Sequence, residues 1–107
     1  MPRWLPRILS RIRNLAAARQ ILFTLKARRE LAALEFALDE EDACVLLAEL
    51  EAEDSAGRLA SATTGEWMYV FMPRVAGETF YVKVILRNEC IVVSFHEDEG
   101  GGHEEDA

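Results

Sequence analysis

The spacing of apolar residues changes once along this 107-residue chain, near Gly57, and the change limits what the chain can fold into. Before Gly57 the apolar residues recur every three or four positions, which is the spacing of an amphipathic helix. After Gly57 they alternate with polar residues in runs rich in β-branched and aromatic side chains, as in strands. Helices followed by strands are typical of an α+β fold, in which the helices cover one face of a sheet.

Three helices are predicted in the first half of the chain. Apolar residues at helical spacing mark the first of them, a basic helix within residues 1–20, where Pro6 is acceptable because it falls in the first turn. Strong helix formers predict the second at 26–36, and Asp39 is a good N-cap for the third. The apolar stripe of the third helix is formed by Ala43, Leu46, Leu47 and Leu50. Residues 21–24 fit either a short strand or an extended link.

Four strands are predicted in the second half, at 57–64, 66–73, 78–87 and 90–97. The connections between them are short, which forces neighbouring strands to be antiparallel. The expected architecture is therefore N-terminal helices packed on a four-stranded antiparallel sheet. Strict alternation predicts the residues that face the helices, namely Phe80, Val82, Val84, Leu86, Ile91, Val93 and Phe95.

The opposite face of the predicted sheet collects groups that can perform acid–base chemistry. Tyr81 and Lys83 project there from one strand, Ser94 and His96 from the next, and Arg58 could join them. Histidine transfers protons near neutral pH and cations stabilise a phosphorane, so these groups suit cleavage of a phosphodiester without a metal. One face of an antiparallel sheet is also often simply solvated. In that alternative, His96 is only the first residue of a frayed tail.

Charge is distributed unevenly along the chain, although the net charge is −7. Residues 1–29 contain eight Lys or Arg and no acid, whereas residues 97–107 contain six acids and no base. The basic N-terminal helix presents either a solvated face or a surface for RNA or a partner protein. Residues 99–107 include three successive glycines among acids and are expected to be a disordered tail, which leaves residues 1–98 as a single domain.

Composition argues against several classes of protein. No apolar run approaches the roughly 20 residues of a membrane span, and arginines interrupt the N-terminus where a secretory signal needs an apolar core. Cys44 and Cys90 do not make a disulfide framework, and with His96 and His103 they lack the paired spacing of a zinc site. We therefore expect a cytoplasmic protein with no metal and no cofactor. The acid-poor, Arg-rich N-terminus also resembles an organellar transit peptide, but the basic run continues into predicted structure.

Residues 21–98 resemble the MqsR family of bacterial type II toxins. The resemblance is carried by "EWMYVFMPRVAGETFYVKVILRNECIVVSFHED", with Trp67 opening a strand, an aromatic-x-Pro at 71–73, Gly77, "YVK" at 81–83 and "SF" at 94–95. It implies a RelE-like microbial RNase fold and an mRNA interferase, a toxin endoribonuclease that inhibits translation and growth. It also implies two partners, mRNA as substrate and a cognate antitoxin with a DNA-binding domain.

The catalytic residues of this family are retained unevenly. Tyr81 and Lys83 match family residues, and His96 stands where the family has a lysine after "SF". Arg58 is nearest to a family lysine in the first strand, while a family glutamine is Met68 here, which cannot replace an amide. The resemblance thus implies attack by the RNA 2′-hydroxyl, with His96 as general acid or base and Tyr81 positioning the phosphate. Arg58 and Lys83 would neutralise that phosphate.

Four further arginines are predicted to bind RNA: Arg7, Arg11, Arg74 and Arg87. A second hypothesis is a catalytically silent MqsR-like protein that binds RNA or only an antitoxin, and Met68 favours it. The sequence leaves open the cleavage site, the dependence on the ribosome, the oligomeric state and the identity of the antitoxin.

Overall fold

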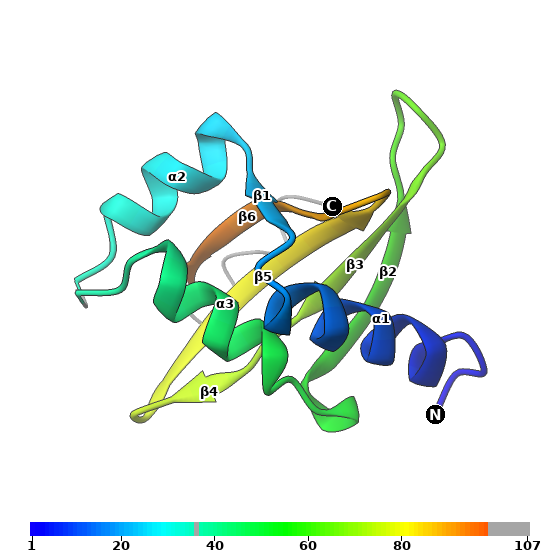
Figure 1. Cartoon of the computed structure of the whole chain (residues 1–107), viewed down its shortest axis with the longest axis horizontal. Coiled ribbons are helices and arrows are strands. Elements are labelled where there is room, and N and C mark those ends of the chain that lie inside the picture. Colours follow the sequence, from blue (N-terminus) through cyan, green and yellow to red (C-terminus); the bar gives the residue numbers. More distant parts are fainter. Residues whose placement is uncertain (36, 99–107) are drawn as a thin grey trace.

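A computed structural model describes residues 1–35 and 37–98 of the chain. In these residues three α-helices precede most of the strands and pack on the sheet, so the predicted α+β class is confirmed (Figure 1). The helices are α1 (Leu5–Ala17), α2 (Leu25–Ala32), α3 (Glu40–Ala48) and the short 3₁₀ helix η1 (Ala52–Asp54). The strands are β1 (Ile21–Phe23), β2 (Ser55–Ala60), β3 (Trp67–Phe71), β4 (Arg74–Val75), β5 (Glu78–Leu86) and β6 (Cys90–Glu97). The expected disordered tail, 99–107, lies outside the described residues.

The described part of the sheet has six strands, two more than predicted, and is mixed rather than antiparallel. Its order is β1-β6-β5-β3-β2, with β4 pairing separately against β5. β1 runs parallel to β6, with Ile21 opposite Cys90 and Phe23 opposite Val92. Three residues are too few to show an alternating pattern, so only the partners offered by β6 make this segment a strand. The prediction of four antiparallel strands is wrong in that respect.

The second additional strand belongs to a tight hairpin. Val75 of β4 pairs with Glu78 of β5, and the two residues between them both have positive φ angles, 54° at Ala76 and 84° at Gly77. Positive φ at both central residues is the conformation of a type I′ turn, whose twist matches that of the flanking strands. This hairpin extends β5 beyond the body of the sheet (Figure 1).

A β-bulge at Val93 changes the alternation of β6. Lys83 of β5 lies opposite Ser94, but the next residue, Val84, lies opposite Val92, so Val93 is left without a partner in the ladder. One extra residue reverses the side of the sheet to which every residue before it points.

The core face of β6 is therefore made by different residues from those predicted. Cys90, Val92 and Phe95 are fully buried, whereas Ile91 and Val93 are only half-buried, so the prediction that these two are buried is wrong. In β5, which has no extra residue, alternation holds. The predicted core residues Phe80, Val82 and Val84 are buried, and Leu86 at the strand end packs on the core half-buried.

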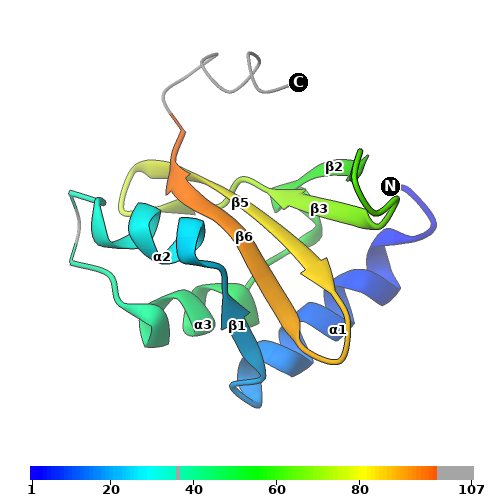
Figure 2. The same ribbon diagram turned by 90° about the horizontal axis from the view of Figure 1, so that it is seen from above.

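The helices supply the other half of the core. Figure 2 shows α1 and α3 beneath the sheet, while α2 lies beside β6. The apolar stripe of α1 is buried at Leu5, Leu9, Ile12 and Ala16, as its spacing predicts. Helix α2 ends at Ala32, before the predicted residue 36. No helix in the described ranges is long and apolar enough to cross a membrane.

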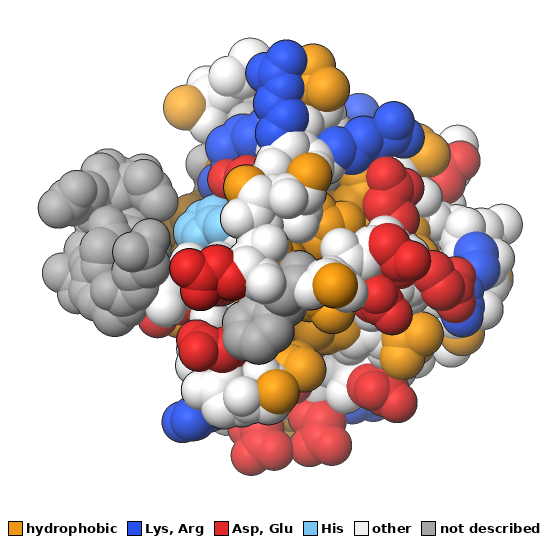
Figure 3. All heavy atoms as spheres, turned by 90° about the vertical axis from the view of Figure 1, so that its left-hand side faces the viewer, with side chains coloured by type: hydrophobic (Ala, Val, Ile, Leu, Met, Phe, Trp, Pro, Cys, Tyr) orange, Lys and Arg blue, Asp and Glu red, His pale blue; other side chains and the backbone are white. Residues whose placement is uncertain are grey.

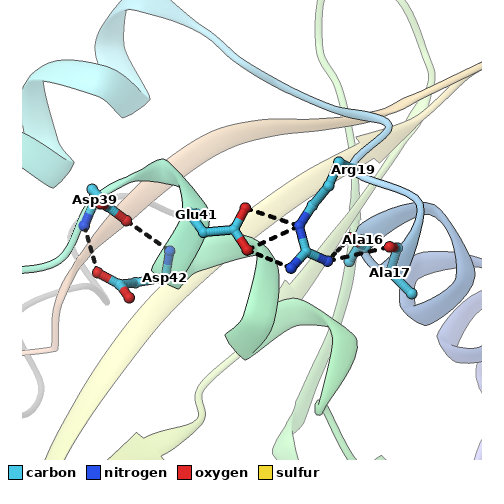
Figure 4. A network of polar contacts seen from close by, with 6 residues as sticks. All are labelled: Ala16, Ala17, Arg19, Asp39, Glu41 and Asp42. Atoms are coloured by element: carbon cyan, nitrogen blue, oxygen red, sulfur yellow. Dashed lines mark hydrogen bonds and ion pairs between the residues drawn. The ribbon is translucent and has the colours of Figure 1, made fainter.

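Capping residues define where α1 ends and α3 begins (Figure 4). Asp39 caps α3 as predicted, and it forms a reciprocal capping box with Asp42. The helix stops at Ala48, so Leu50 is buried from the following loop rather than from the predicted helical stripe. Arg19 donates to the Ala16 carbonyl at the end of α1 and to Glu41 in the first turn of α3. These charges complement the dipoles of both helices.

Candidate functional site

Tyr81 and His96 lie directly opposite each other in the β5–β6 ladder. Their rings are stacked, with 5.0 Å between the centroids and 13° between the planes. The tyrosine is buried at 7% exposure, and the half-buried histidine lies over it near the end of β6, as predicted. The tyrosine ring therefore supports the imidazole from beneath and restricts its orientation.

A backbone hydrogen bond determines which nitrogen of His96 is available for chemistry. Nδ1 lies 2.9 Å from the carbonyl oxygen of Glu97. A carbonyl oxygen can only accept, so Nδ1 carries the proton in this contact. In the neutral ring the lone pair is then on Nε2, which can act as a base.

Lys83 and Ser94 form the next cross-strand pair on the same face of the sheet. Lys83 is half-buried, while Ser94 is 1% exposed and is the only polar residue in the buried class among the described residues. The buried Ser94 hydroxyl is satisfied by Lys26 of α2, whose Nζ lies 2.7 Å from Oγ. Lys26 is thus a second lysine at this face, beside Lys83, and it was not among the residues predicted from the sequence.

Glu30 holds Lys26 in place and attaches α2 to β6. Its Oε2 lies 3.0 Å from Nζ of Lys26, one helical turn away, and its Oε1 accepts from the backbone N–H of Phe95 at 3.0 Å. β1 pairs only with residues 90–92 of β6. Farther along this edge of the sheet, the Glu30 carboxylate accepts a backbone hydrogen bond that a neighbouring strand would otherwise accept. The i,i+4 spacing of Lys26 and Glu30 was visible in the sequence, but their contact with β6 was not.

Arg58 does not join this group. It lies opposite Tyr69, which lies opposite Val84, so Arg58 is on the face of the sheet that the helices cover. Its guanidinium stacks 3.8 Å from the ring centroid of Trp67 and 4.9 Å from that of Trp4. The prediction that Arg58 could join Tyr81 is wrong, because pairing with Tyr69 turns Arg58 to the face that the helices cover.

Met68, at the place of the family glutamine, does lie on the open face. It is half-buried and pairs with Ile85, two residues along β5 from Lys83. Its thioether adds a weak acceptor and no donor to this part of the face.

The four predicted RNA-binding arginines are not gathered in one place. Arg7 and Arg11 lie on α1, where Arg11 donates to the backbone carbonyl of Arg87. The Arg87 side chain is engaged by both carboxylate oxygens of Glu66, at 2.9 and 2.7 Å. This pairing raises the pKa of Arg87 and lowers that of Glu66. Arg74 lies on the β4 hairpin, away from this group.

A hollow of about 380 Å³ opens beside His96, between the end of α2 and the end of β6. It is lined by Glu30, Ala33, Leu34, Glu35, His96 and Glu97. His96 is half-buried, and Figure 3 shows basic side chains gathered at the top of the face that it draws. The imidazole is thus accessible from solvent at a concave part of the surface.

Metal ligands are not grouped in the described ranges 1–35 and 37–98, where no three His, Cys, Asp or Glu side chains come together to hold an ion. Both cysteines are free and buried, and burial raises the pKa of Cys90 to about 12. A thiol so protonated is not available as a nucleophile.

Comparison with known proteins shows the family of the chain. No curated protein matches the chain in sequence. The model of one protein family, described as "Motility quorum-sensing regulator, toxin of MqsA", does match it over residues 7–97. The match includes Tyr81, Lys83 and His96 together with most of α1. Because the match spans most of its length, the chain belongs to the MqsR family, toxins of toxin–antitoxin systems whose antitoxin partner is MqsA.

Proposed function

We propose that this toxin is an endoribonuclease of the mRNA interferase type, which cleaves mRNA in the cytoplasm and thereby inhibits translation and growth. The observation that carries the proposal is the pairing of Tyr81 with His96 next to the pairing of Lys83 with Ser94. A proton-transferring ring and fixed cations on one open sheet face are the groups that phosphodiester cleavage needs.

In the proposed reaction Nε2 of His96 removes the proton from the 2′-hydroxyl of RNA. The 2′-oxygen attacks the adjacent phosphorus, the bond to the 5′-oxygen breaks, and water donates a proton to that leaving oxygen, while the imidazolium later loses its proton to solvent. The products are a 2′,3′-cyclic phosphate and a 5′-hydroxyl. The Nδ1 hydrogen bond to Glu97 keeps the basic nitrogen at Nε2, and the ring of Tyr81 holds the imidazole in orientation.

Negative charge on the phosphate would be neutralised by Lys83 and Lys26. Both lysines lie next to Ser94. Lys83 is its partner across the β5–β6 ladder, and Nζ of Lys26 donates a 2.7 Å hydrogen bond to its hydroxyl. Lys26 therefore takes the role for which Arg58 was predicted, since the guanidinium of Arg58 is packed on Trp67 on the other face. A cation already held by protein contacts needs little reorganisation when charge develops.

The test is cleavage of a defined RNA by the purified chain, with the product ends identified by mass spectrometry. We expect a 2′,3′-cyclic phosphate, loss of activity in His96→Ala, and wild-type activity in the matched control Asn88→Ala on the exposed β5–β6 turn. Folded protein that cleaves no RNA, or a His96→Ala variant that cleaves at the wild-type rate, would contradict the proposal.

A second candidate is a catalytically silent member of the family that binds RNA or the antitoxin alone. Met68 supports it, because this position on the open face lacks the donor that a glutamine would supply. Expression of the chain without antitoxin separates the two candidates. Growth arrest that His96→Ala relieves supports the nuclease, whereas harmless expression of folded protein supports the silent relative.

A further inference from the structure

A second concave surface lies away from His96, between α3, η1 and the β4 hairpin. It is a groove of about 460 Å³ and is larger than the hollow beside the histidine. Its floor is apolar and is formed by Leu38, Val45, Leu46, Leu50, Pro73 and Val75. Two of these side chains are well exposed, Val45 at 41% and Val75 at 38%. Apolar side chains gathered in a groove mark a surface where another molecule can bind.

Acidic residues surround this floor. The lining residues include five carboxylates, Asp42, Glu49, Glu51, Glu53 and Asp54, against a single base, Arg74. On the face drawn in Figure 3, acidic side chains likewise surround hydrophobic ones in the middle and lower part of the view. Such a rim repels phosphate, so this groove does not extend the proposed RNA site.

The carboxylates are crowded in a way that is unfavourable in the isolated chain. A hydrogen bond and repulsion from Glu51, together with repulsion from Asp54, raise the pKa of Glu53. Glu49 stands at the C-cap of α3, where the helix dipole already places partial negative charge. A cationic partner would relieve both sources of repulsion.

In a second copy of this chain, the most basic of the helices does not supply a matching segment. Its basic helix, α1, uses its apolar stripe in its own core, with Leu5, Leu9 and Ile12 buried. The exposed side chains of α1 are mostly charged, polar or small, Arg7 and Arg11 among them, and they cannot fill an apolar floor. The groove requires apolar and basic side chains on the same segment.

We infer that this groove binds a basic amphipathic segment of a partner protein. Apolar side chains of the segment occupy the floor over Val45 and Val75, and its Lys or Arg residues meet the acidic rim. This is the pattern of an amphipathic helix bound in a groove, with apolar anchors at i, i+3 and i+4. Charge complementarity selects basic partners and speeds association.

The experiment uses the full chain and a fluorescein-labelled peptide of Leu and Lys at helical spacing, about 14 residues or four turns long. Fluorescence anisotropy measures its affinity, beside a scrambled peptide and a version with Glu in place of Lys. Wild-type protein should bind the amphipathic basic peptide at least tenfold more tightly than either of the others. If the scrambled peptide bound equally tightly, the charge of the peptide alone would explain its binding, and the inference would be overturned.

Variants locate the peptide on the protein. The floor variant Val45→Ser/Val75→Ser and the rim variant Glu49→Gln/Glu53→Gln should each weaken binding about tenfold, the effect of about 1.4 kcal/mol. Matched controls are Leu22→Ser/Leu59→Ser, exposed apolar residues elsewhere, and Glu66→Gln/Glu89→Gln, acids that do not line the groove. Equal weakening in the controls would overturn the inference. We expect RNA cleavage to be unchanged in every groove variant, because the groove shares no lining residue with the hollow beside His96, so this test is independent of the proposed nuclease.

Discussion

The imidazole of His96 lies parallel to the ring of Tyr81 across the β5–β6 ladder, at 5.0 Å between centroids. The pair is formed after the bulge at Val93, which places Phe95 in the core and His96 on the opposite face. A strand without the bulge could not bury Val92 and also present His96 beside Tyr81. The bulge thus couples the packing of β6 to the position of the candidate catalytic group.

Replacing His96 with alanine should lower the rate of RNA cleavage by about a hundredfold or more, the usual contribution of one acid–base group. His96→Gln should be nearly as slow, because glutamine forms hydrogen bonds but does not titrate. A rate of cleavage in either variant equal to that of the wild type would show that His96 has no catalytic role.

Lys26 should matter for cleavage although it lies on a helix rather than in the main sheet. We expect Lys26→Gln to lower the rate by roughly tenfold to a hundredfold, as when one donor to a developing anion is lost. Lys26→Arg should recover part of the loss. The control is Arg29→Gln, an exposed cation on the same helix.

Melting temperatures should accompany the Lys26 measurements. Glu30 still accepts from the N–H of Phe95 when Lys26 is replaced, so α2 should stay attached to β6. A Lys26→Gln variant that melts like the wild type but cleaves slowly supports a chemical role. Equal cleavage by Lys26→Gln and Arg29→Gln would remove Lys26 from the site.

The arginines should contribute unequally to RNA affinity, because Glu66 already neutralises Arg87. Replacing a phosphate-binding cation lowers the slope of log affinity against log salt by about one. Arg7→Gln should show this decrease, whereas Arg87→Gln should leave the slope nearly unchanged. Glu66→Gln frees the guanidinium and should increase the slope. If Arg87→Gln lowered the slope as much as Arg7→Gln does, Glu66 could not be neutralising Arg87.

The ion pair between Arg19 and Glu41 should stabilise the fold above acidic pH. Hydrogen bonds from Arg19 lower the pKa of Glu41 below its ordinary value of 4.5. The stabilisation is therefore complete above that value and is lost as pH falls through the lower folded-state pKa. Thermal melts of wild type and Glu41→Gln should differ near neutral pH and converge in acid. Glu78→Gln, at the exposed start of β5, should show no such convergence.

The thiol of Cys90 should be inert in the folded chain. Burial raises its pKa to about 12, and only the thiolate reacts rapidly with alkylating agents. At pH 8 we expect iodoacetamide to modify Cys90 only in denaturant, as measured by intact-mass spectrometry. Cys90→Ala keeps Cys44 and serves as the control. Alkylation of Cys90 in folded protein would show that β6 opens locally.

Several features were predictable because they depend on neighbours in the sequence. Helix α3 begins where Asp39 can cap it, and the stripe of α1 is buried as its spacing indicates. Alternation in β5 correctly separated Phe80 and Val82 from Tyr81 and Lys83. Local geometry sets these properties, because a cap or a regular strand is complete within a few residues.

Other features depended on partners far away in the chain. The burial of Ile91 and Val93 was predicted wrongly, because nothing in the residues of β6 alone marks the bulge that pairing with β5 creates. Arg58 was predicted on the wrong face for the same kind of reason, since its pairing with Tyr69 of β3 decides its direction. A one-residue change of register reverses a side chain, and register is a property of two strands.

By itself, the sequence determined the α+β class, the family, and the presence of Tyr81, Lys83 and His96 on strands that could share a face. Only the tertiary structure decided that Lys26 completes this group and that Arg58 does not. The physical reason is that periodicity fixes directions within one element, whereas the contact of Lys26 with Ser94 joins residues 68 positions apart. Such contacts arise only when α2 packs against the edge of β6.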